Sequence, residues 1–566
     1  MRCLFPRKPF VATGLLIQAS GVFLIAVGFL LALAPSAPFS KELGVCESGA
    51  VRDVLGGHVI LPRFLPGPMV HVPPLYWWLT ALCVKALGWN EPAFRLPSLV
   101  AAPLTCSIVF TWSSKMLGPR VGWWSAAALL LCHFFLDAAR QPRMDSMLAL
   151  FVTAAVVSLE RGIGAPERRQ NWYFVAAACA IGLGALTKGI LGIVLPGVVI
   201  AIFLLIRRRM KELFRLDLAA TFMAGLAIGV AWFIAGYRLG GRPFLEWQVE
   251  MNLWSRFIPA GAGGAEYCSH PFWYFAPHIL SGFLPWSLYL PAVALAAWPS
   301  VDRQLPEAIL YTICWFAALF LFFSASHGKC LIYILPAFPP LAILVGWTIV
   351  EAQAGTGTWL SRLYASGSIT IAFGTLVLMF AALIVIGYGI PASLELRLHP
   401  TDRRFVELLM RQGYNHRLLF WVVFSIVSVV VTLGGWLRGA PKLEALGTLL
   451  VAAVGGWFWF GVMNPALARA ETLKTFAREV AGSVPAGQIV HFGLGDCELN
   501  FYSPRPLAPI SKVSCASQTT PGEYVIIRKR DFDAIPISRR ACFTVESEAT
   551  PNDSIGPRLL IRWTVR

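Results

Sequence analysis

The sequence predicts an all-α polytopic membrane protein with a small α/β domain at its C-terminal end. Of the 566 residues, 57% are hydrophobic and 14% are charged, whereas soluble domains carry about 25% charged residues. Apolar runs long enough to cross a bilayer, about 20 residues, recur along the first 463 residues. The last 103 residues carry 23 charged side chains, against 54 in the preceding 463. The tail is therefore expected to fold outside the membrane.

Thirteen apolar segments are candidates for membrane helices. The first follows Arg7 and Lys8 and is too long for a cleaved signal peptide, so we expect a retained anchor. In chain order the segments are 10–34, 93–114, 121–139, 145–160, 171–187, 189–206, 217–237, 272–297, 306–325, 330–350, 366–389, 417–437 and 445–463. An odd number of spans puts the two termini on opposite faces of the membrane.

The distribution of Lys and Arg favours a cytoplasmic N-terminus, because cytoplasmic loops carry more of these residues. Two long external loops, 35–92 and 238–271, contain aromatic residues and Pro or Gly breaks, which suit amphipathic helices at the membrane surface. We predict a transmembrane domain over 1–463 and an external α/β domain over 464–566. The chain has a net charge of +17 but no basic stripe with interleaved aromatic residues. Membrane lipids, not nucleic acid, are therefore the expected partners.

Three polar clusters lie at the outer ends of predicted spans, where ionisable residues are costly and mark candidate sites. They are Asp145 at the start of one span, Lys188 at a tight turn between two spans, and 326–329 (SHGK) followed by Tyr333. Each has an ordinary alternative, since Asp145 suits a helix N-cap and Lys188 an interfacial cation. Their convergence on one face favours a single external site.

Six ordered motifs carry a resemblance to a known family. They are 73–80 (PPLYWWLT), 91–98 (EPAFRLPS), 143–145 (RMD), 186–189 (LTKG), 271–274 (PFWY) with 282–286 (GFLPW), and 333–340 (YILPAFPP). This pattern resembles the GT-C membrane glycosyltransferases, in particular the aminoarabinose–lipid A transferases (ArnT) and the protein O-mannosyltransferases. The resemblance covers about residues 40–350.

The resemblance implies a GT-C fold in a bacterial inner membrane, with the C-terminal domain in the periplasm. It implies transfer of a sugar, such as 4-amino-4-deoxy-L-arabinose, from polyprenyl (undecaprenyl) phosphate to an envelope acceptor. Lipid A, another glycan or a protein would be the acceptor, and the anomeric centre would be inverted. No cofactor is required for this chemistry. A departing phosphate needs cations, and the acceptor oxygen needs a carboxylate.

Several residues match these roles in the resemblance. Asp145 matches the second acid of the family and is expected to be catalytic. The expected ligands of the lipid phosphate are cationic or phenolic side chains: Lys188, Arg256, Tyr333, Arg52 and Arg143.

The first loop departs from the family pattern, which opens with an Asp-Glu pair that is absent here. Glu42 or Glu47 is the expected replacement as catalytic base, and either equally suits an ordinary solvated carboxylate. Loss of the base would leave a GT-C scaffold that binds lipid phosphate or a partner without turnover. A secondary transporter is a third alternative, but the sequence lacks the repeated halves typical of that class.

The resemblance also implies a candidate divalent-metal site, for which zinc is the expected ion. Family members have two loop positions that bind a divalent metal, and here these fall at His71 and near Cys268 and His270. Imidazole and thiolate ligands suit Zn²⁺ better than carboxylates do.

Overall fold

A computed structural model gives the architecture of the chain. It describes residues 12–33, 36–39, 48–63, 72–249, 270–298, 305–355, 358–388, 407, 416–485, 490–493, 498–503, 508–510, 524–535, 540, 543–549 and 558–563. These residues form two compact units. Unit 1 comprises Met1–Leu33, Pro97–Met379 and Phe420–Trp457, and unit 2 comprises Ala34–Leu96, Phe380–Leu419 and Phe458–Arg566.

Helices make up most of the described chain up to residue 463. They are α1 (Ala12–Ala32), α4 (Glu91–Leu117), α5 (Pro119–Leu130), α6 (His133–Arg140), α7 (Asp145–Gly164), α8 (Glu167–Lys188), α9 (Leu191–Ile206), α10 (Leu216–Val249), α12 (Phe275–Gly282), α13 (Leu290–Ala297), α14 (Glu307–Ala325), α15 (Phe338–Gln353), α16 (Thr358–Tyr388), α19 (His416–Leu437) and α20 (Pro441–Trp457). Short 3₁₀ helices connect some of them: η2 (Met210–Phe214), η5 (Phe272–Tyr274), η6 (Trp286–Tyr289) and η7 (Leu331–Ala337). A π-helical turn, η8 (Phe458–Met463), follows α20.

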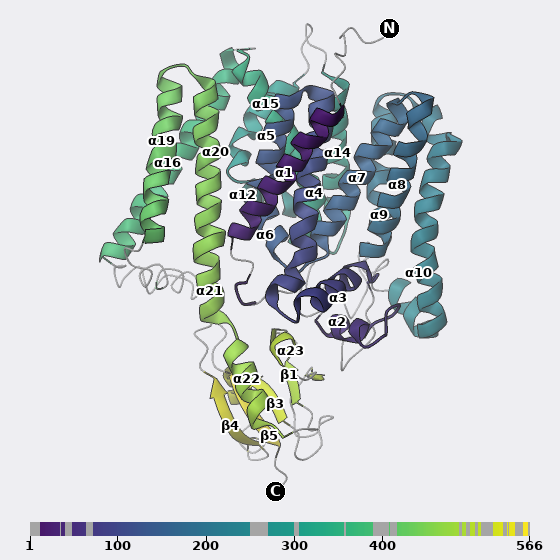
Figure 1. Ribbon diagram of the computed structural model, residues 1–566, viewed down its shortest axis with the longest axis vertical. Coiled ribbons are helices and arrows are strands. Elements are labelled where there is room, and N and C mark those ends of the chain that lie inside the picture. Colours follow the sequence, from purple (N-terminus) through teal and green to yellow (C-terminus); the bar gives the residue numbers. More distant parts are fainter. Residues whose placement is uncertain are drawn as a thin grey trace. The chain divides into compact units, whose positions relative to one another are not determined.

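Unit 1 is a helical bundle in which α7, α8, α9 and α10 run side by side (Figure 1). Glycines allow α8 and α10 to approach closely, since a Cβ added at Gly182 or Gly225 would collide with an isoleucine of the other helix. Helix α15 is almost entirely buried and packs against α5, α13, α14 and α20. The core of this unit therefore surrounds α15.

Nine described helices are long and apolar enough to cross a membrane, and two bent pairs raise this number to eleven. The predicted span 121–139 is divided into α5 and α6, which meet at 62°, and the predicted span 272–297 bends by 105° between α12 and α13. Helices α8 and α9 lie at two further predicted spans, 171–187 and 189–206. The all-α polytopic fold is confirmed, while the count of thirteen crossings stays a prediction.

Unit 2 contains the first predicted external loop together with the C-terminal tail. Its described elements are α2 (Ser48–Leu55), α3 (Leu75–Leu87), α21 (Asn464–Glu471), α22 (Lys474–Ser483), β1 (Val490–Gly493), α23 (Glu498–Tyr502), β2 (Ala508–Ile510), β3 (Tyr524–Arg528), α24 (Lys529–Asp533), β4 (Phe543–Ala549) and β5 (Arg558–Trp563). Helices were expected in the loop 35–92, and α2 and α3 lie there.

The tail folds into a five-stranded sheet with the order β2-β1-β3-β5-β4. Strand β1 pairs in parallel with β2 and β3, whereas β5 pairs antiparallel with β3 and β4. Parallel pairs need a crossover connection, so the mixed sheet is a small α/β fold as predicted.

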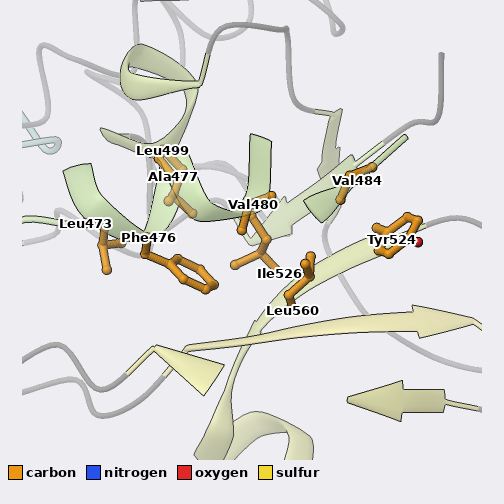
Figure 2. Close-up of a cluster of buried hydrophobic side chains, with 9 residues drawn as sticks. All are labelled: Leu473, Phe476, Ala477, Val480, Val484, Leu499, Tyr524, Ile526 and Leu560. Carbon is orange, nitrogen blue, oxygen red and sulfur yellow. The ribbon is translucent and has the colours of Figure 1, made fainter. Parts of the chain in front are cut away.

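An apolar cluster joins α22 to one face of the sheet (Figure 2). Phe476, Ala477 and Val480 on α22 pack with Ile526 of β3 and Leu560 of β5, and each is at most 5% exposed. The spacing of the α22 residues places them on one face of the helix. Burial of this face stabilises the helix against the sheet.

The first loop and the tail contact each other at α23. The ring of Phe501 packs edge-to-face on Phe39 and Phe94, with ring centroids 4.8 Å apart in both pairs. The indole Nε1 of Trp89 donates a hydrogen bond to the carbonyl of Phe501 over 2.9 Å. Glu91 accepts hydrogen bonds from Lys474 at 2.7 Å and from Tyr502 at 3.0 Å. Residues more than 380 positions apart in sequence thus form one unit.

Candidate functional site

The candidate site in unit 1 begins where α7 starts and α8 ends. Asp145 is the first residue of α7, and Lys188 is the last residue of α8. Helix α8 stops there because Gly189 adopts φ 64°, a left-handed conformation that glycine tolerates. The two helices are consecutive, antiparallel and joined by only a short connection. The start of the first and the end of the second therefore lie at the same end of the bundle.

Asp145 and Lys188 form a buried ion pair. The Lys188 Nζ donates a hydrogen bond to Oδ1 of Asp145. Their side chains are only 8% and 11% exposed, respectively. Removing one partner of such a pair leaves an uncompensated buried charge, so the pair is strongly coupled.

Tyr333 completes this cluster from a third element, η7. The Lys188 ammonium lies 4.3 Å from the centre of the Tyr333 ring, within the range of a cation–π interaction. The backbone N–H of Tyr333 donates to the carbonyl of Cys330 over 3.0 Å, which fixes the turn that presents the ring. The structure thus brings together three of the residues selected from the sequence.

The segment before α7 holds Asp145 in position through side-chain hydrogen bonds to its backbone. The Ser98 hydroxyl donates to the carbonyl of Arg143 over 2.9 Å, and the Ser146 hydroxyl donates to that of Ala138 over 3.0 Å. Arg143 is partly buried two residues before Asp145. Its backbone contacts give it a positioning role, while binding of phosphate by its guanidinium stays a prediction.

Lys329 is a buried cation that the sequence analysis noted only as part of the 326–329 cluster. It is 4% exposed. Its Nζ donates to the carbonyl of Ser326 over 2.5 Å and to that of His270 over 2.9 Å. Burial lowers the pKa of Lys329. The signal that could have singled it out is its place between α14 and η7, four residues before Tyr333.

His270 is the one residue of the predicted zinc site that the structure describes. Its ring stacks on Tyr274 with centroids 4.1 Å apart and an interplanar angle of 5°. His71 and Cys268 lie outside the described residues. Within the part of the chain that is described, no group of three or more His, Cys, Asp or Glu side chains is arranged to hold a metal ion. The zinc site stays a prediction.

Arg52 lies in unit 2, on α2. Its Nη2 donates to the carbonyls of Asn500 at 3.3 Å and Ser503 at 2.6 Å, and its guanidinium lies 4.4 Å from the centre of the Trp89 ring. Burial lowers the pKa of Arg52. These contacts make Arg52 a link between the first loop and α23. Its assignment as a phosphate ligand stays a prediction.

The remaining predicted site residues cannot be placed. Glu42, Glu47 and Arg256 lie outside the described residues, as do the two zinc candidates named above. The replacement for the first-loop base is therefore a prediction that rests on the sequence alone.

Sequence comparison finds transferases of lipid-linked sugars. The family described as dolichyl-phosphate-mannose-protein mannosyltransferase matches residues 71–235, which include Asp145 and Lys188. An undecaprenyl phosphate-alpha-4-amino-4-deoxy-L-arabinose arabinosyl transferase of Erwinia tasmaniensis is 28% identical over 415 residues, 72% of this chain and 70% of the relative. The protein of the same name from Pseudomonas aeruginosa is 31% identical over 304 residues, 53% of each chain. The chain thus spans about half the length of the Pseudomonas relative.

Structural comparison covers almost the whole chain. The crystal structure of ArnT from Cupriavidus metallidurans bound to undecaprenyl phosphate superposes with a TM-score of 0.73 and 21% sequence identity, over 97% of this chain and 98% of that one. The apo structure of the same protein gives a TM-score of 0.72. The chain therefore has the fold of this ArnT structure, which agrees with the fold class predicted from the sequence. The buried Asp145–Lys188 pair lies within the region that the family comparison matches.

Proposed function

We propose that this protein is an integral-membrane glycosyltransferase that moves a sugar from undecaprenyl phosphate to an acceptor of the bacterial envelope. The observation that carries the proposal is the buried cluster of Asp145, Lys188 and Tyr333 in a chain with the GT-C fold. The names of the relatives point to 4-amino-4-deoxy-L-arabinose as the sugar and undecaprenyl phosphate as the carrier. ArnT of Cupriavidus metallidurans binds undecaprenyl phosphate in its crystal structure.

The reaction is a displacement at the anomeric carbon. An acceptor oxygen forms a new bond to that carbon, the bond between the carbon and the phosphate oxygen breaks, and the lipid phosphate departs with the bonding electrons. The proton of the acceptor, where it has one, passes to a carboxylate. Attack opposite the leaving group inverts the anomeric centre.

Asp145 supplies the carboxylate in this scheme. It is fixed at the start of α7 by the ion pair with Lys188, so its orientation is set before substrate binds. Pre-organisation of this kind reduces the reorganisation needed in the transition state. Asp145 either receives the proton or orients the acceptor oxygen.

Lys188 stabilises the negative charge of the departing lipid phosphate in this scheme. Its ammonium already lies between a carboxylate and the face of the Tyr333 ring, in a site where little water screens its charge. A lipid phosphate that enters the site competes with Asp145 for this ammonium. Donor binding then weakens the ion pair and frees the carboxylate to accept a hydrogen bond from the acceptor.

The names of the relatives support a proposal for the acceptor and for the location. Lipid A is the proposed acceptor, by analogy with the ArnT proteins, and the reaction would take place at the periplasmic face of the inner membrane. In this orientation the N-terminus is cytoplasmic and the tail, 464–566, is periplasmic. Glu42 and Glu47 in the first loop are the candidates for a second carboxylate, and His71, Cys268 and His270 are the candidates for a zinc site.

The proposal is tested by sugar transfer in proteoliposomes with undecaprenyl phosphate-aminoarabinose as donor and lipid A as acceptor. The wild-type protein is expected to modify lipid A, and Asp145→Asn to lose at least about 100-fold in rate, the lower range for general acid–base catalysis. Glu351→Gln is the matched control, because Glu351 lies on α15 and accepts a hydrogen bond from Trp347 away from the cluster. This variant is expected to keep its activity.

Two results would contradict the proposal. Full transfer by Asp145→Asn would remove Asp145 from the mechanism. Binding of undecaprenyl phosphate by the wild-type protein without any transfer would favour the non-catalytic scaffold instead. Loss of activity in only one of Glu42→Gln and Glu47→Gln would locate the first-loop base, whereas full activity in both would mean that the base is elsewhere. Elemental analysis of wild type and His71→Ala tests for zinc.

A further inference from the structure

Lys329 differs from Lys188 in the way its charge is compensated. Lys188 has a carboxylate partner, whereas the partners of the Lys329 ammonium among the described residues are two neutral carbonyls, those of Ser326 and His270. An ammonium has three donors, so one N–H of Lys329 is not used by these two bonds. No ion pair joins Lys329 to a carboxylate within the described residues.

Burying such a cation without an anion is unfavourable. Lys329 is 96% removed from solvent, with 4% of its surface exposed. A buried ammonium paired only with neutral groups pays a desolvation cost that a counter-ion would offset. A Gln or Ser side chain can donate to a carbonyl without carrying a charge, so bonding to the two carbonyls does not by itself require an ammonium.

The position of Lys329 connects it to the site of sugar transfer. It lies between α14 and η7, and Tyr333 of η7 follows four residues later, with its ring against the Lys188 ammonium. Helix α7, which begins at Asp145, also packs against η7. Lys329 therefore belongs to the same short segment that builds one wall of the cluster.

We propose that the third N–H of Lys329 binds a phosphate oxygen of the lipid-linked donor. The inference rests on the proposed function, since it assigns a further ligand to the phosphate of that substrate. Lys329 would supply the positive charge that Lys188, neutralised by Asp145, does not supply in full. The two hydrogen bonds to carbonyls hold the ammonium in place. The third N–H of Lys329 therefore has a fixed orientation when the phosphate binds.

The same contacts let phosphate binding act on two separate parts of the chain. Through the carbonyl of His270, Lys329 ties the beginning of the 270–298 region to the turn before η7. An anion bound through the third N–H compensates the charge of this ammonium without breaking either hydrogen bond to a carbonyl.

The test measures binding of undecaprenyl phosphate and of undecaprenol, the same lipid without phosphate, to the full-length protein in nanodiscs. Lys329→Met is expected to weaken binding of the phosphate form about 30-fold, which corresponds to about 2 kcal/mol at 1.4 kcal/mol per tenfold. Binding of undecaprenol is expected to change less than about threefold, because only the charge–phosphate contact is lost. Lys329→Arg is expected to retain most of the preference for phosphate.

Two further variants separate charge from structure. Lys329→Gln keeps N–H donors for the carbonyls but removes the charge, and it is expected to lose the phosphate preference while it remains folded. Lys211→Met removes an exposed lysine of η2 in the same unit and is expected to bind like wild type.

The outcomes are distinct from those that test the proposed function. Wild-type transfer with unchanged phosphate binding in both Lys329→Met and Lys329→Gln would overturn this inference and leave the function intact. Equal loss of both lipids in both variants would show a structural role only, and would also overturn it. Absence of transfer by the wild-type protein would instead contradict the proposed function.

Discussion

The strongest energetic consequence of the structure is the coupling between Asp145 and Lys188. Their side chains are 8% and 11% exposed, so removing one partner leaves the other charge in a poorly hydrated place. Breaking a buried pair in this way costs about 3–5 kcal/mol, whereas removing both partners together costs much less. We expect Asp145→Asn and Lys188→Met each to lower the free energy of unfolding by at least about 3 kcal/mol.

The double variant Asp145→Asn/Lys188→Met is expected to cost no more than the costlier single variant. The coupling energy would then be at least about 3 kcal/mol, at the upper end of the range for residues in contact. The assay is equilibrium unfolding of the four proteins in bicelles by SDS, followed by tryptophan fluorescence. The chain has 21 Trp residues to report on the bundle.

The matched control is an exposed pair in the same unit. Arg242 and Glu246 lie one turn apart on α10, 2.8 Å from each other, with side chains 86% and 53% exposed. Surface pairs of this spacing contribute about 0.3–0.5 kcal/mol. The reasoning is refuted if the Asp145–Lys188 cycle gives a coupling as small as this control, with the two single variants adding in the double.

Three other predictions concern residues outside that pair. Arg52→Met is expected to destabilise unit 2 by about 1.5–3 kcal/mol, because a charged donor to two carbonyls is lost; faster proteolysis of the tail measures this, and an unchanged rate contradicts it. Tyr502→Phe removes the hydroxyl that donates a hydrogen bond to Glu91 and is expected to lower the melting temperature. Tyr524→Phe is the control and is expected to leave the melting temperature unchanged. Burial lowers the pKa of Lys329 from its ordinary value of 10.5. Between the lowered pKa and 10.5 the unfolded chain therefore binds more protons than the folded chain, and the free energy of unfolding rises with pH. Lys329→Gln is expected to flatten this rise, and identical pH profiles of stability for the variant and wild type would disprove the prediction.

Helix positions were predictable because the apolar runs are long and continuous. The expected span 306–325 is α14 (Glu307–Ala325), and the expected span 189–206 contains α9 (Leu191–Ile206). Breaks inside an apolar run carry no such signal. The run 121–139 remains apolar through Leu131 and Cys132, where α5 ends and α6 begins, because side chains on both sides of the bend are buried in apolar surroundings.

The joining of the first loop to the tail was not predictable from the sequence. Glu91 and Lys474 are 383 residues apart, and neither residue type indicates its partner. The contact depends on packing of Phe501 among aromatic residues of the loop, and such long-range pairing leaves no periodic pattern. The linear division at residue 463 follows composition, whereas the compact units follow these contacts.

The core of the site could be predicted because it follows from counting helices. Two consecutive antiparallel helices bring Asp145 and Lys188 to one end, and their charges at span ends marked both residues. The approach of Tyr333 to Lys188 also agrees with the expected convergence on one face. Lys329 was not selected, because burial and the lack of a carboxylate partner are properties of packing that a sequence does not display.

A structure of the protein bound to undecaprenyl phosphate is the most direct test of the central claim. The account predicts a phosphate oxygen within about 3.2 Å of the Lys188 ammonium, close to the Tyr333 ring, with Asp145 facing the position of the anomeric carbon. A phosphate bound elsewhere, with Lys188 still paired only to Asp145, would contradict it.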